Sequence, residues 1–285
     1  MALESINKVT LTGLVVDIIV RTATNKNGQE YIAGRVILET APDNLIPVEF
    51  YQNKMTKNNT PNSVYKGLVT MIEEFKTIAR DGRDAADLVS IDSAQLGENS
   101  FYSQTGALIR EFKVSSPFYN RKANAELQNQ YIVSGVVLNL VDEIKLDVPT
   151  GKLLIDLLLI GYKNRGDVIK LVVEDEKGVS YMKNSLSMGD EAKFAGQIII
   201  AETRNEKIEE AAFGDPIIQY DVRTEKKLIV TSATPAKASA IPSDELETIL
   251  ADREGRLAKA KADTEKKNND TSKVSNAASK RNFSL

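Results

Sequence analysis

Aromatic and basic side chains recur together at alternating positions of strand-like segments. Tyr31 and Arg35 share one face of such a segment, and Tyr51 lies on the outward face of the next. Aromatic rings can stack on nucleic-acid bases, and lysine or arginine can neutralise the phosphates between them. The candidates for this chemistry are Tyr31, Arg35, Tyr51, Lys54, Lys57, Phe101, Tyr102, Arg110, Tyr119, Arg121, Lys122, Tyr162, Lys163 and Lys170.

Catalytic chemistry has few candidates in this sequence. The chain contains no cysteine and no histidine, which excludes thiolate catalysis, cysteine-bound zinc and the Ser-His-Asp triad. It also lacks the glycine motifs that bind nucleotide phosphates. Asp142 and Glu143 could in principle hold Mg²⁺, but they fall in a predicted turn without a partner cluster. We therefore predict a protein that is not an enzyme and that uses no cofactor and no metal.

Composition gives a weaker indication of partners. With 40 acidic and 37 basic residues, the chain as a whole has no field that attracts polyanions, although a local basic groove can still be present. No apolar run approaches the ~20 residues that span a bilayer. The first residues also lack the pattern of a signal peptide. We therefore expect a cytoplasmic protein without a membrane contact.

The elements that position the candidate residues follow the same order twice. In residues 1–122, strand-like runs at 9–19, 31–39 and 46–52 precede a helical period over 62–80 and two more runs at 87–96 and 107–115. Ile32, Val36 and Leu38 form the inward face of the second run, whereas Phe101 and Tyr102 fall in the last hairpin loop. Residues 129–235 repeat this order, with a helix expected over 179–186 and a polar hairpin loop around 205–214.

Five strands with a helix between the third and the fourth is the order of the OB-fold, a small barrel whose exposed sheet face binds oligonucleotides. The expected fold is therefore mainly β, with two tandem five-stranded OB-fold barrels at 1–122 and 129–235. Gly13 and Gly135 lie in the first strands, where a small barrel bends sharply. Two ordinary antiparallel sandwiches are the alternative, but they leave the single helix of each half unexplained.

Residues 236–285 form a tail. A Pro/Ala/Ser-rich linker leads to Ser243, which can cap a helix that we expect to end near Lys267. The remaining residues are polar and are predicted to be disordered. We expect the tail to contribute little to the barrel cores.

The two halves also resemble a known family. The segment INKVTLTGLVVDI, the runs GQEYIAGRVILE and PVEFYQN, and the closing hairpin ADLVSIDSAQLGENSFYSQTGALIREFKVSSP are similar to bacterial and phage single-stranded DNA-binding proteins. A fainter copy of the closing hairpin occurs in the second half. The resemblance implies OB-fold domains that bind single-stranded DNA, with possible self-association.

The chain departs from that family in several respects. Its members usually have one OB domain and end in an acidic stretch with Pro-Phe that docks partner proteins, whereas this chain has two halves and ends in KRNFSL. The family implies that a replication or recombination protein could bind the tail. Tandem domains with a variable tail suggest a phage-encoded member, which would act in the host cytoplasm.

Structural roles compete with binding at several candidates. Tyr31 and Tyr51 could be an ordinary cross-strand pair, and Tyr119 with Arg121 could pack the two halves together. The second half is the more acidic one, so Tyr162, Lys163 and Lys170 are predicted to be weaker contacts. The sequence as a whole predicts binding of single-stranded DNA without strong sequence preference in replication, recombination or repair. An assembly protein that acts through protein contacts and an RNA-binding OB protein are the alternatives.

Overall fold

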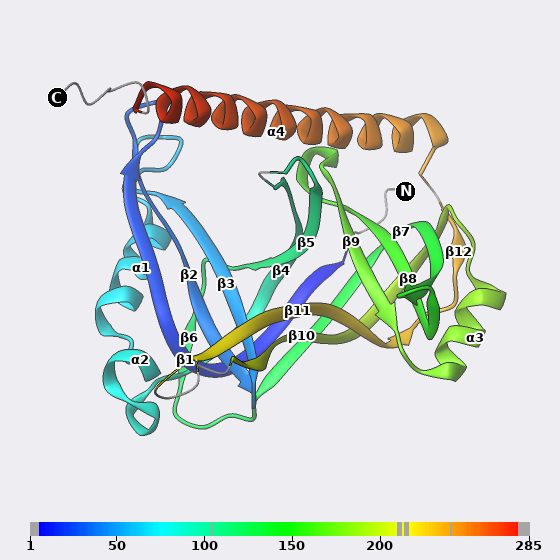
Figure 1. Cartoon of the computed structure of the whole chain (residues 1–285), viewed down its shortest axis with the longest axis horizontal. Coiled ribbons are helices and arrows are strands. Elements are labelled where there is room, and N and C mark those ends of the chain that lie inside the picture. The colour runs from blue at the N-terminus through cyan, green and yellow to red at the C-terminus, as the bar shows by residue number, and fades with distance from the viewer. Residues whose placement is uncertain (1–5, 104, 210–212, 214–216, 240, 279–285) are drawn as a thin grey trace.

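The computed structural model describes residues 6–103, 105–209, 213, 217–239 and 241–278, and at 203–209, 217, 219–223 and 267–278 it describes the backbone alone. The first half holds β1 (Asn7–Thr24), β2 (Glu30–Ala41), β3 (Asn44–Asn53), α1 (Ser63–Glu74), α2 (Ile78–Asp81), β4 (Leu88–Tyr102), β5 (Leu108–Ser115) and β6 (Asn120–Lys122). The second half holds β7 (Gln128–Lys145), β8 (Val148–Ile160), β9 (Gly166–Val173), α3 (Glu176–Ser185), β10 (Asp190–Glu209), β11 (Ile217–Ala233) and β12 (Lys237–Ala238). A long helix, α4 (Ser243–Ala278), follows (Figure 1).

Both halves are OB-fold barrels, as the order of the elements predicted. In the first barrel, β1 pairs with β2, β2 with β3, β3 in parallel with β5, β5 with β4, and β4 again with β1. The second barrel closes in the same order through β7, β8, β9, β11 and β10, with β9 and β11 parallel. The inward residues Ile32, Val36 and Leu38 are buried as expected.

The helix between the third and fourth strands of each barrel is locally encoded. Asn62 caps α1 by accepting from the backbone N–H of Val64 at 3.0 Å, and Asp175 caps α3 by accepting from Gly178 at 2.8 Å. The single helix predicted over 62–80 is wrong. Phe75 is extended and buried, which ends α1, and the Thr77 hydroxyl then caps the short α2.

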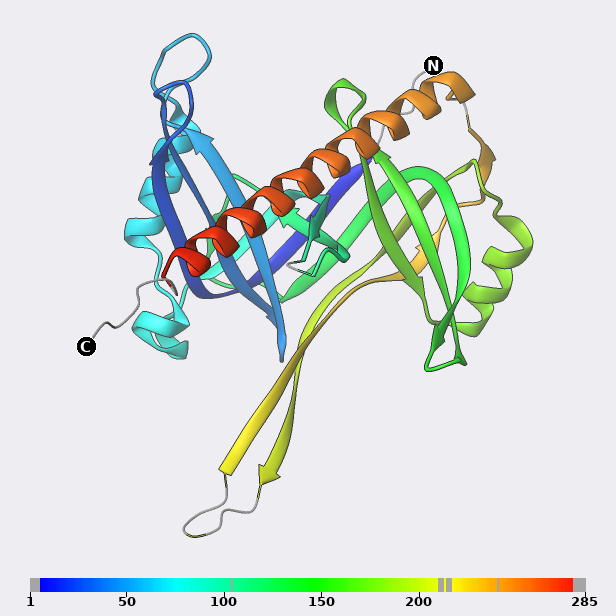
Figure 2. The same ribbon diagram turned by 45° about the horizontal axis from the view of Figure 1, so that its top comes forward.

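Two hairpins are longer than the sequence predicted. β4 continues to Tyr102, so Phe101 and Tyr102 lie at the end of a strand and not in a loop. β10 continues to Glu209 and pairs with β11 as far as Ile217, so much of the predicted polar loop at 205–214 is strand. The resulting β10–β11 arm extends well beyond the second barrel (Figure 2).

The two barrels join through their first strands, and the junction has approximate two-fold symmetry. In the repeat, Asn129 takes the place of Asn7 and Val133 that of Leu11. Asn7 pairs with Val133 and Leu11 pairs with Asn129, so the pairing is symmetric about the centre of β1 and β7. The side chains of the two asparagines also make equivalent hydrogen bonds, each to the backbone of the fourth strand of a barrel. Asn7 bonds both backbone groups of Leu96, and Asn129 donates to the carbonyl oxygen of Ile198.

Gly13 and Gly135 occupy points where strands approach closely. A Cβ at Gly13 would lie 2.6 Å from the carbonyl oxygen of Glu39, and one at Gly135 would lie 2.2 Å from that of Leu158. Neither distance leaves room for a side chain. The two glycines therefore permit the tight coiling of β1 and β7 that closes each barrel.

The tail contributes to the core, contrary to expectation. α4 starts at Ser243 as predicted but continues to Ala278, past the expected end at Lys267, and it crosses over both barrels (Figure 1). Ile249 is buried against Val136 and Leu158 of the second barrel. Among the described residues, no helix combines the length and the apolar character that crossing a bilayer requires.

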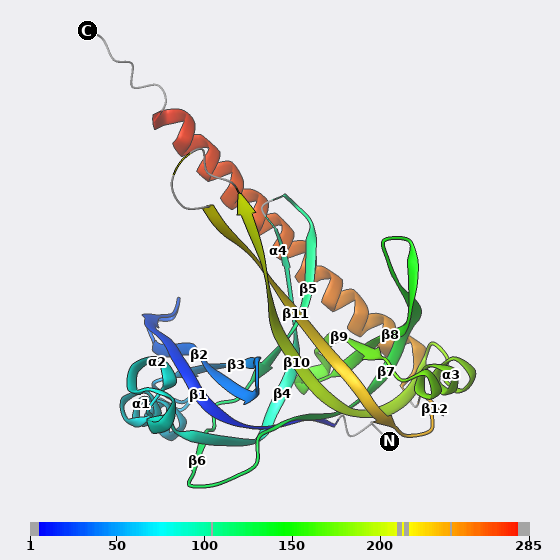
Figure 3. The same ribbon diagram turned by 60° about the horizontal axis from the view of Figure 1, so that its bottom comes forward.

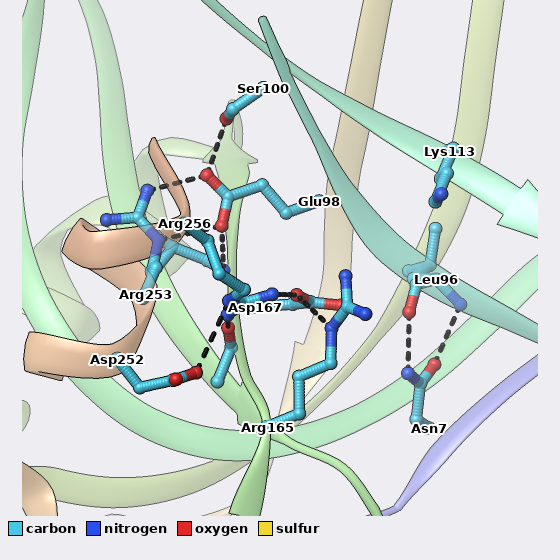
Figure 4. Close-up of polar contacts among 12 residues, drawn as sticks. Asn7, Leu96, Glu98, Ser100, Lys113, Arg165, Asp167, Asp252, Arg253 and Arg256 are labelled. Carbon is cyan, nitrogen blue, oxygen red and sulfur yellow. Dashed lines mark hydrogen bonds and ion pairs between the residues drawn. The ribbon is translucent and has the colours of Figure 1, made fainter. Parts of the chain in front are cut away.

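An ion pair fixes α4 to both barrels. The Arg253 guanidinium donates to both carboxylate oxygens of Glu98 at 2.6 and 2.7 Å, and Glu98 also accepts from Ser100 and from the backbone N–H of Val168 (Figure 4). Glu98 belongs to the first barrel and Val168 to the second. Three separate parts of the chain therefore meet at one carboxylate.

Candidate nucleic-acid interface

The outer face of β1, β2 and β3 in the first barrel carries the main group of candidate residues. Strand register places Arg21, Ala33 and Tyr51 in one row across the three strands. The small Ala33 lies between two long side chains and leaves a shallow hollow of about 540 Å³. Arg35 lies in the next row and lines the same hollow. This is the sheet face by which OB-folds bind oligonucleotides.

An aromatic pair borders this hollow. The rings of Tyr31 and Tyr51 have centroids 5.0 Å apart and an interplanar angle of 33°. Tyr31 is half-buried, whereas Tyr51 is 49% exposed and its hydroxyl donates to Asn53 at 3.1 Å. The two rings therefore form the cross-strand contact that was the structural alternative to binding. The same contact holds the Tyr51 ring in an exposed position. Such a ring can stack on a base with little further loss of side-chain entropy.

The basic residues around the hollow differ in how they are paired. Arg21, Arg35 and Lys57 are exposed and make no ion pair within the described part of the chain. Lys54, in contrast, lies 3.0 Å from Glu30, and its hydrogen bond is the main cause of the lowered pKa of that carboxyl group. Arg21 was not predicted, although it lies two residues after Ile19 and so shares the outward face of the first strand with it. Lys54 is a weaker candidate for phosphate contact than the arginines.

A second hollow, of about 390 Å³, continues the first along β3 and β5. It shares Glu49, Phe50 and Tyr51 with the first hollow, and its other lining includes Ser115 and the exposed Phe118. We call the two hollows together the first-barrel groove. Its acidic residue, Glu49, lies 3.7 Å from Lys113, which offsets its charge.

The hairpin and connector candidates of the first barrel have mixed environments. Phe101 is 41% exposed, whereas Tyr102 is half-buried, with the Lys261 ammonium of α4 at 6.0 Å from its ring centroid. Lys122 is exposed on β6. Phe101 and Lys122 can therefore reach a ligand, while Tyr102 already has a neighbour above its ring.

Tyr119 and Arg121 have structural partners. The Tyr119 hydroxyl donates to the carbonyl oxygen of Val48 at 3.2 Å and its ring packs edge-on against Phe50, while burial raises the pKa of its phenol. Arg121 pairs with Asp87 at 3.1 Å and lies 4.8 Å from the ring of Phe75. Both side chains hold the first barrel together, so we do not include them in the proposed interface.

The candidates of the second barrel fall into two places. Tyr162 and Lys163 form an exposed turn, in which Tyr162 is 83% exposed and the Lys163 ammonium lies 5.5 Å from its ring centroid. Lys170 lies on β9, and together with Arg110 of β5 it lines a cleft between the barrels.

The sheet face of the second barrel that corresponds to the first-barrel groove is partly covered. Val136, Leu158 and Val168 form a row across β7, β8 and β9. Ile249 of α4 packs on this row, and the Arg256 guanidinium donates to the carbonyl oxygen of Gly166. The two barrels therefore share a fold, but α4 packs on the outer face of the second barrel, whereas the first barrel has an open hollow beside Tyr51.

A family model matches residues 5–269, which include both barrels and most of α4. The chain belongs to the YorF family. No curated protein matches this member of the family.

Three solved structures that match are each at most 11% identical to this chain. The wild-type single-stranded DNA binding protein from Thermus aquaticus is 9% identical, with a TM-score of 0.47 over 84% of this chain and 97% of that chain. A deletion mutant of the same protein gives 11% identity and a TM-score of 0.45 over the same shares. A replication protein A heterotrimer bound to ssDNA is 10% identical, with a TM-score of 0.24 over 88% of this chain and 53% of that chain.

Proposed function

We propose that this protein binds single-stranded DNA with little sequence preference and acts, without catalysis of its own, in replication, recombination or repair. The observation that carries the proposal is the exposed Tyr51 ring, held by Tyr31 and flanked by Arg21 and Arg35 on the outer face of an OB-fold barrel. Neither arginine makes an ion pair among the described residues, and Glu49, which lies opposite Arg35 in the β2–β3 register, pairs with Lys113 instead. Aromatic faces beside unpaired cations are what a single strand requires.

Physical considerations favour a single strand over a duplex. A ring can stack on a base only where the base face is accessible, and in a duplex neighbouring bases cover both faces. Each base stacked on an aromatic side chain contributes ~1–3 kcal/mol, and each neutralised phosphate adds a salt-dependent term. Stacking on an aromatic ring and contact with a phosphate both tolerate any base, so weak sequence preference is expected.

Protein–protein contact is the alternative function, and one feature favours it. The tip of the β7–β8 hairpin exposes Ile144, Leu146 and Val148, with Leu146 98% exposed at a positive φ of 51°. The equivalent tip of the first barrel, residues 24–30, is polar. An apolar tip of this kind is typical of surfaces that contact other proteins. Self-association, or a replication or recombination protein at this tip or at the end of α4, is compatible with DNA binding by the first barrel.

Fluorescence anisotropy with labelled oligo-dT, oligo-U and duplex DNA over a salt series separates these functions. We expect oligo-dT to bind at low salt, to weaken as salt rises, and to bind more tightly than the duplex. Equal affinity for the duplex would refute the single-strand proposal, and tighter binding of oligo-U would assign the protein to RNA. No binding of any oligonucleotide would favour the assembly function.

A further inference from the structure

A cleft between the two barrels receives strands from both of them. β5 of the first barrel contributes residues 109–112, and the second barrel contributes Asp156 of β8, residues of β9, and Lys226 of β11. β5 lies beside β9 in both Figure 1 and Figure 3. The volume of the cleft is about 280 Å³, close to the ~300 Å³ at which ligand pockets begin.

The lining of the cleft carries three basic and two acidic residues. Lys226 lies 2.5 Å from Glu111 of the opposite barrel, so these two charges balance each other. Arg110 and Lys170 are exposed and make no ion pair among the residues that the structure describes. The other acidic residue, Asp156, is opposite Lys170 in the β8–β9 register. The lining as a whole therefore carries more positive than negative charge.

Apolar side chains complete the walls. Ile109 of the first barrel and Val168 and Val172 of the second line the cleft together with Arg110 and Lys170. Apolar walls beside convergent cations match a ligand with one flat uncharged part and one anionic part. A nucleotide has both.

The cleft is also connected to the first-barrel groove. Ser115 of β5 lines the groove and Glu111 of the same strand lines the cleft. At ~3.3 Å per residue, these positions are about 13 Å apart along the strand. This is the length of about four nucleotides at the ~3.4 Å spacing of a stacked strand.

We propose that the cleft binds one nucleotide of a single strand that leaves the first-barrel groove along β5, with its phosphate held by Arg110 and Lys170 and its base against Ile109, Val168 and Val172. This inference rests on the proposed function and adds a second contact, to which both barrels contribute. The bound segment must therefore be longer than the outer face of one barrel can cover. It also predicts that the second barrel contributes to DNA affinity although α4 covers part of its sheet.

The test compares oligo-dT of 5 and of 15 nucleotides by anisotropy, using Arg110→Gln, Lys170→Gln and the double variant. Lys66→Gln on α1 and Lys177→Gln on α3 are matched controls, because both lysines are exposed and lie outside the groove and the cleft. Each variant is first checked for an unchanged melting temperature. Glutamine keeps a polar side chain while removing the charge.

For the 15-mer we expect a loss of about tenfold per cleft substitution, the size of one charge-assisted hydrogen bond. The slope of log K against log salt should flatten by ~0.7 for each lost phosphate contact. The 5-mer and the control variants should be unaffected. A double variant that binds the 15-mer like the controls, while the wild-type protein binds it normally, would overturn this inference alone. A wild-type protein that binds neither length would overturn the proposed function as well.

Discussion

Removal of Arg253 tests how far α4 is part of the folded body. The Arg253 and Glu98 side chains are only 9% and 7% exposed, and two hydrogen bonds join them. Arg253→Met keeps most of the apolar stem but leaves the Glu98 carboxylate buried without its cation. Breaking a buried pair in this way costs ~3–5 kcal/mol. At ~2–4 °C per kcal/mol for a body of this size, we expect the melting temperature to fall by roughly 6–20 °C.

Calorimetry of four variants measures how much the Arg253–Glu98 ion pair contributes to the free energy of unfolding. Glu98→Gln and the Glu98→Gln/Arg253→Met double variant complete a double-mutant cycle, and the double variant should recover part of the loss because no charge stays buried. Arg165→Met is the matched control, since Arg165 pairs with Asp167 in the same region but is 59% exposed (Figure 4). That control should change stability by no more than ~1 kcal/mol. Equal effects of Arg253→Met and Arg165→Met would refute the account of α4.

The same pair predicts a dependence of stability on pH. Desolvation acts to raise the pKa of Glu98, but the hydrogen bonds from Arg253, Ser100 and Val168 outweigh it, and the pKa is lowered. A lowered pKa means stability that is present above the ordinary glutamate value of ~4.3 and is lost as the pH falls through the folded-state value. The stability difference between wild type and Glu98→Gln should therefore shrink in acid, and a constant difference down to pH 2 would contradict this.

Three further predictions concern binding, barrel closure and the tail. Arg35→Gln should flatten the salt slope of oligo-dT binding by ~0.7, and an unchanged slope would remove Arg35 from the interface. Gly13→Ala should destabilise the first barrel by ~1–3 kcal/mol, because a backbone oxygen lies 2.6 Å from the new methyl group. Gly67→Ala is the control and should not destabilise the barrel, because the space around Gly67 is open. Thermal melts of both variants test this. A chain that ends at Ala236 should melt at a lower temperature, since it uncovers the apolar row beneath α4. It should still bind oligo-dT, because no α4 residue whose side chain the structure describes lines the groove. Lost binding with an intact fold would place part of the interface on α4.

Local pattern was sufficient to predict the barrels. Alternation identified the buried face of β2, and the change from period two to a helical period located α1 and α3 between the third and fourth strands of each half. The break at Phe75 escaped that approach because an apolar residue fits the helical period whether it continues the helix or ends it.

Contacts between distant segments could not be predicted in this way. The thin apolar face of α4 suggested a free tail. Nothing in the sequence around Ile249 indicates that it packs against Leu158, and nothing around Arg253 indicates that it pairs with Glu98. Arg21 was missed for a related reason, since its place beside Tyr51 depends on the register of three strands. Tyr119 and Arg121 illustrate the converse, because side chains of the right chemistry proved to be held by the fold.

The central claim is that the outer face of the first barrel binds single-stranded DNA, and the affinity of Tyr31→Ala/Tyr51→Ala for oligo-dT tests it most directly. At ~1–3 kcal/mol per lost stack, the double variant should bind at least about fivefold more weakly than the wild-type protein, with a nearly unchanged salt slope because stacking releases no counterions. Its melting temperature serves to separate lost contact from lost fold. A folded double variant that binds oligo-dT as tightly as the wild-type protein would contradict the claim.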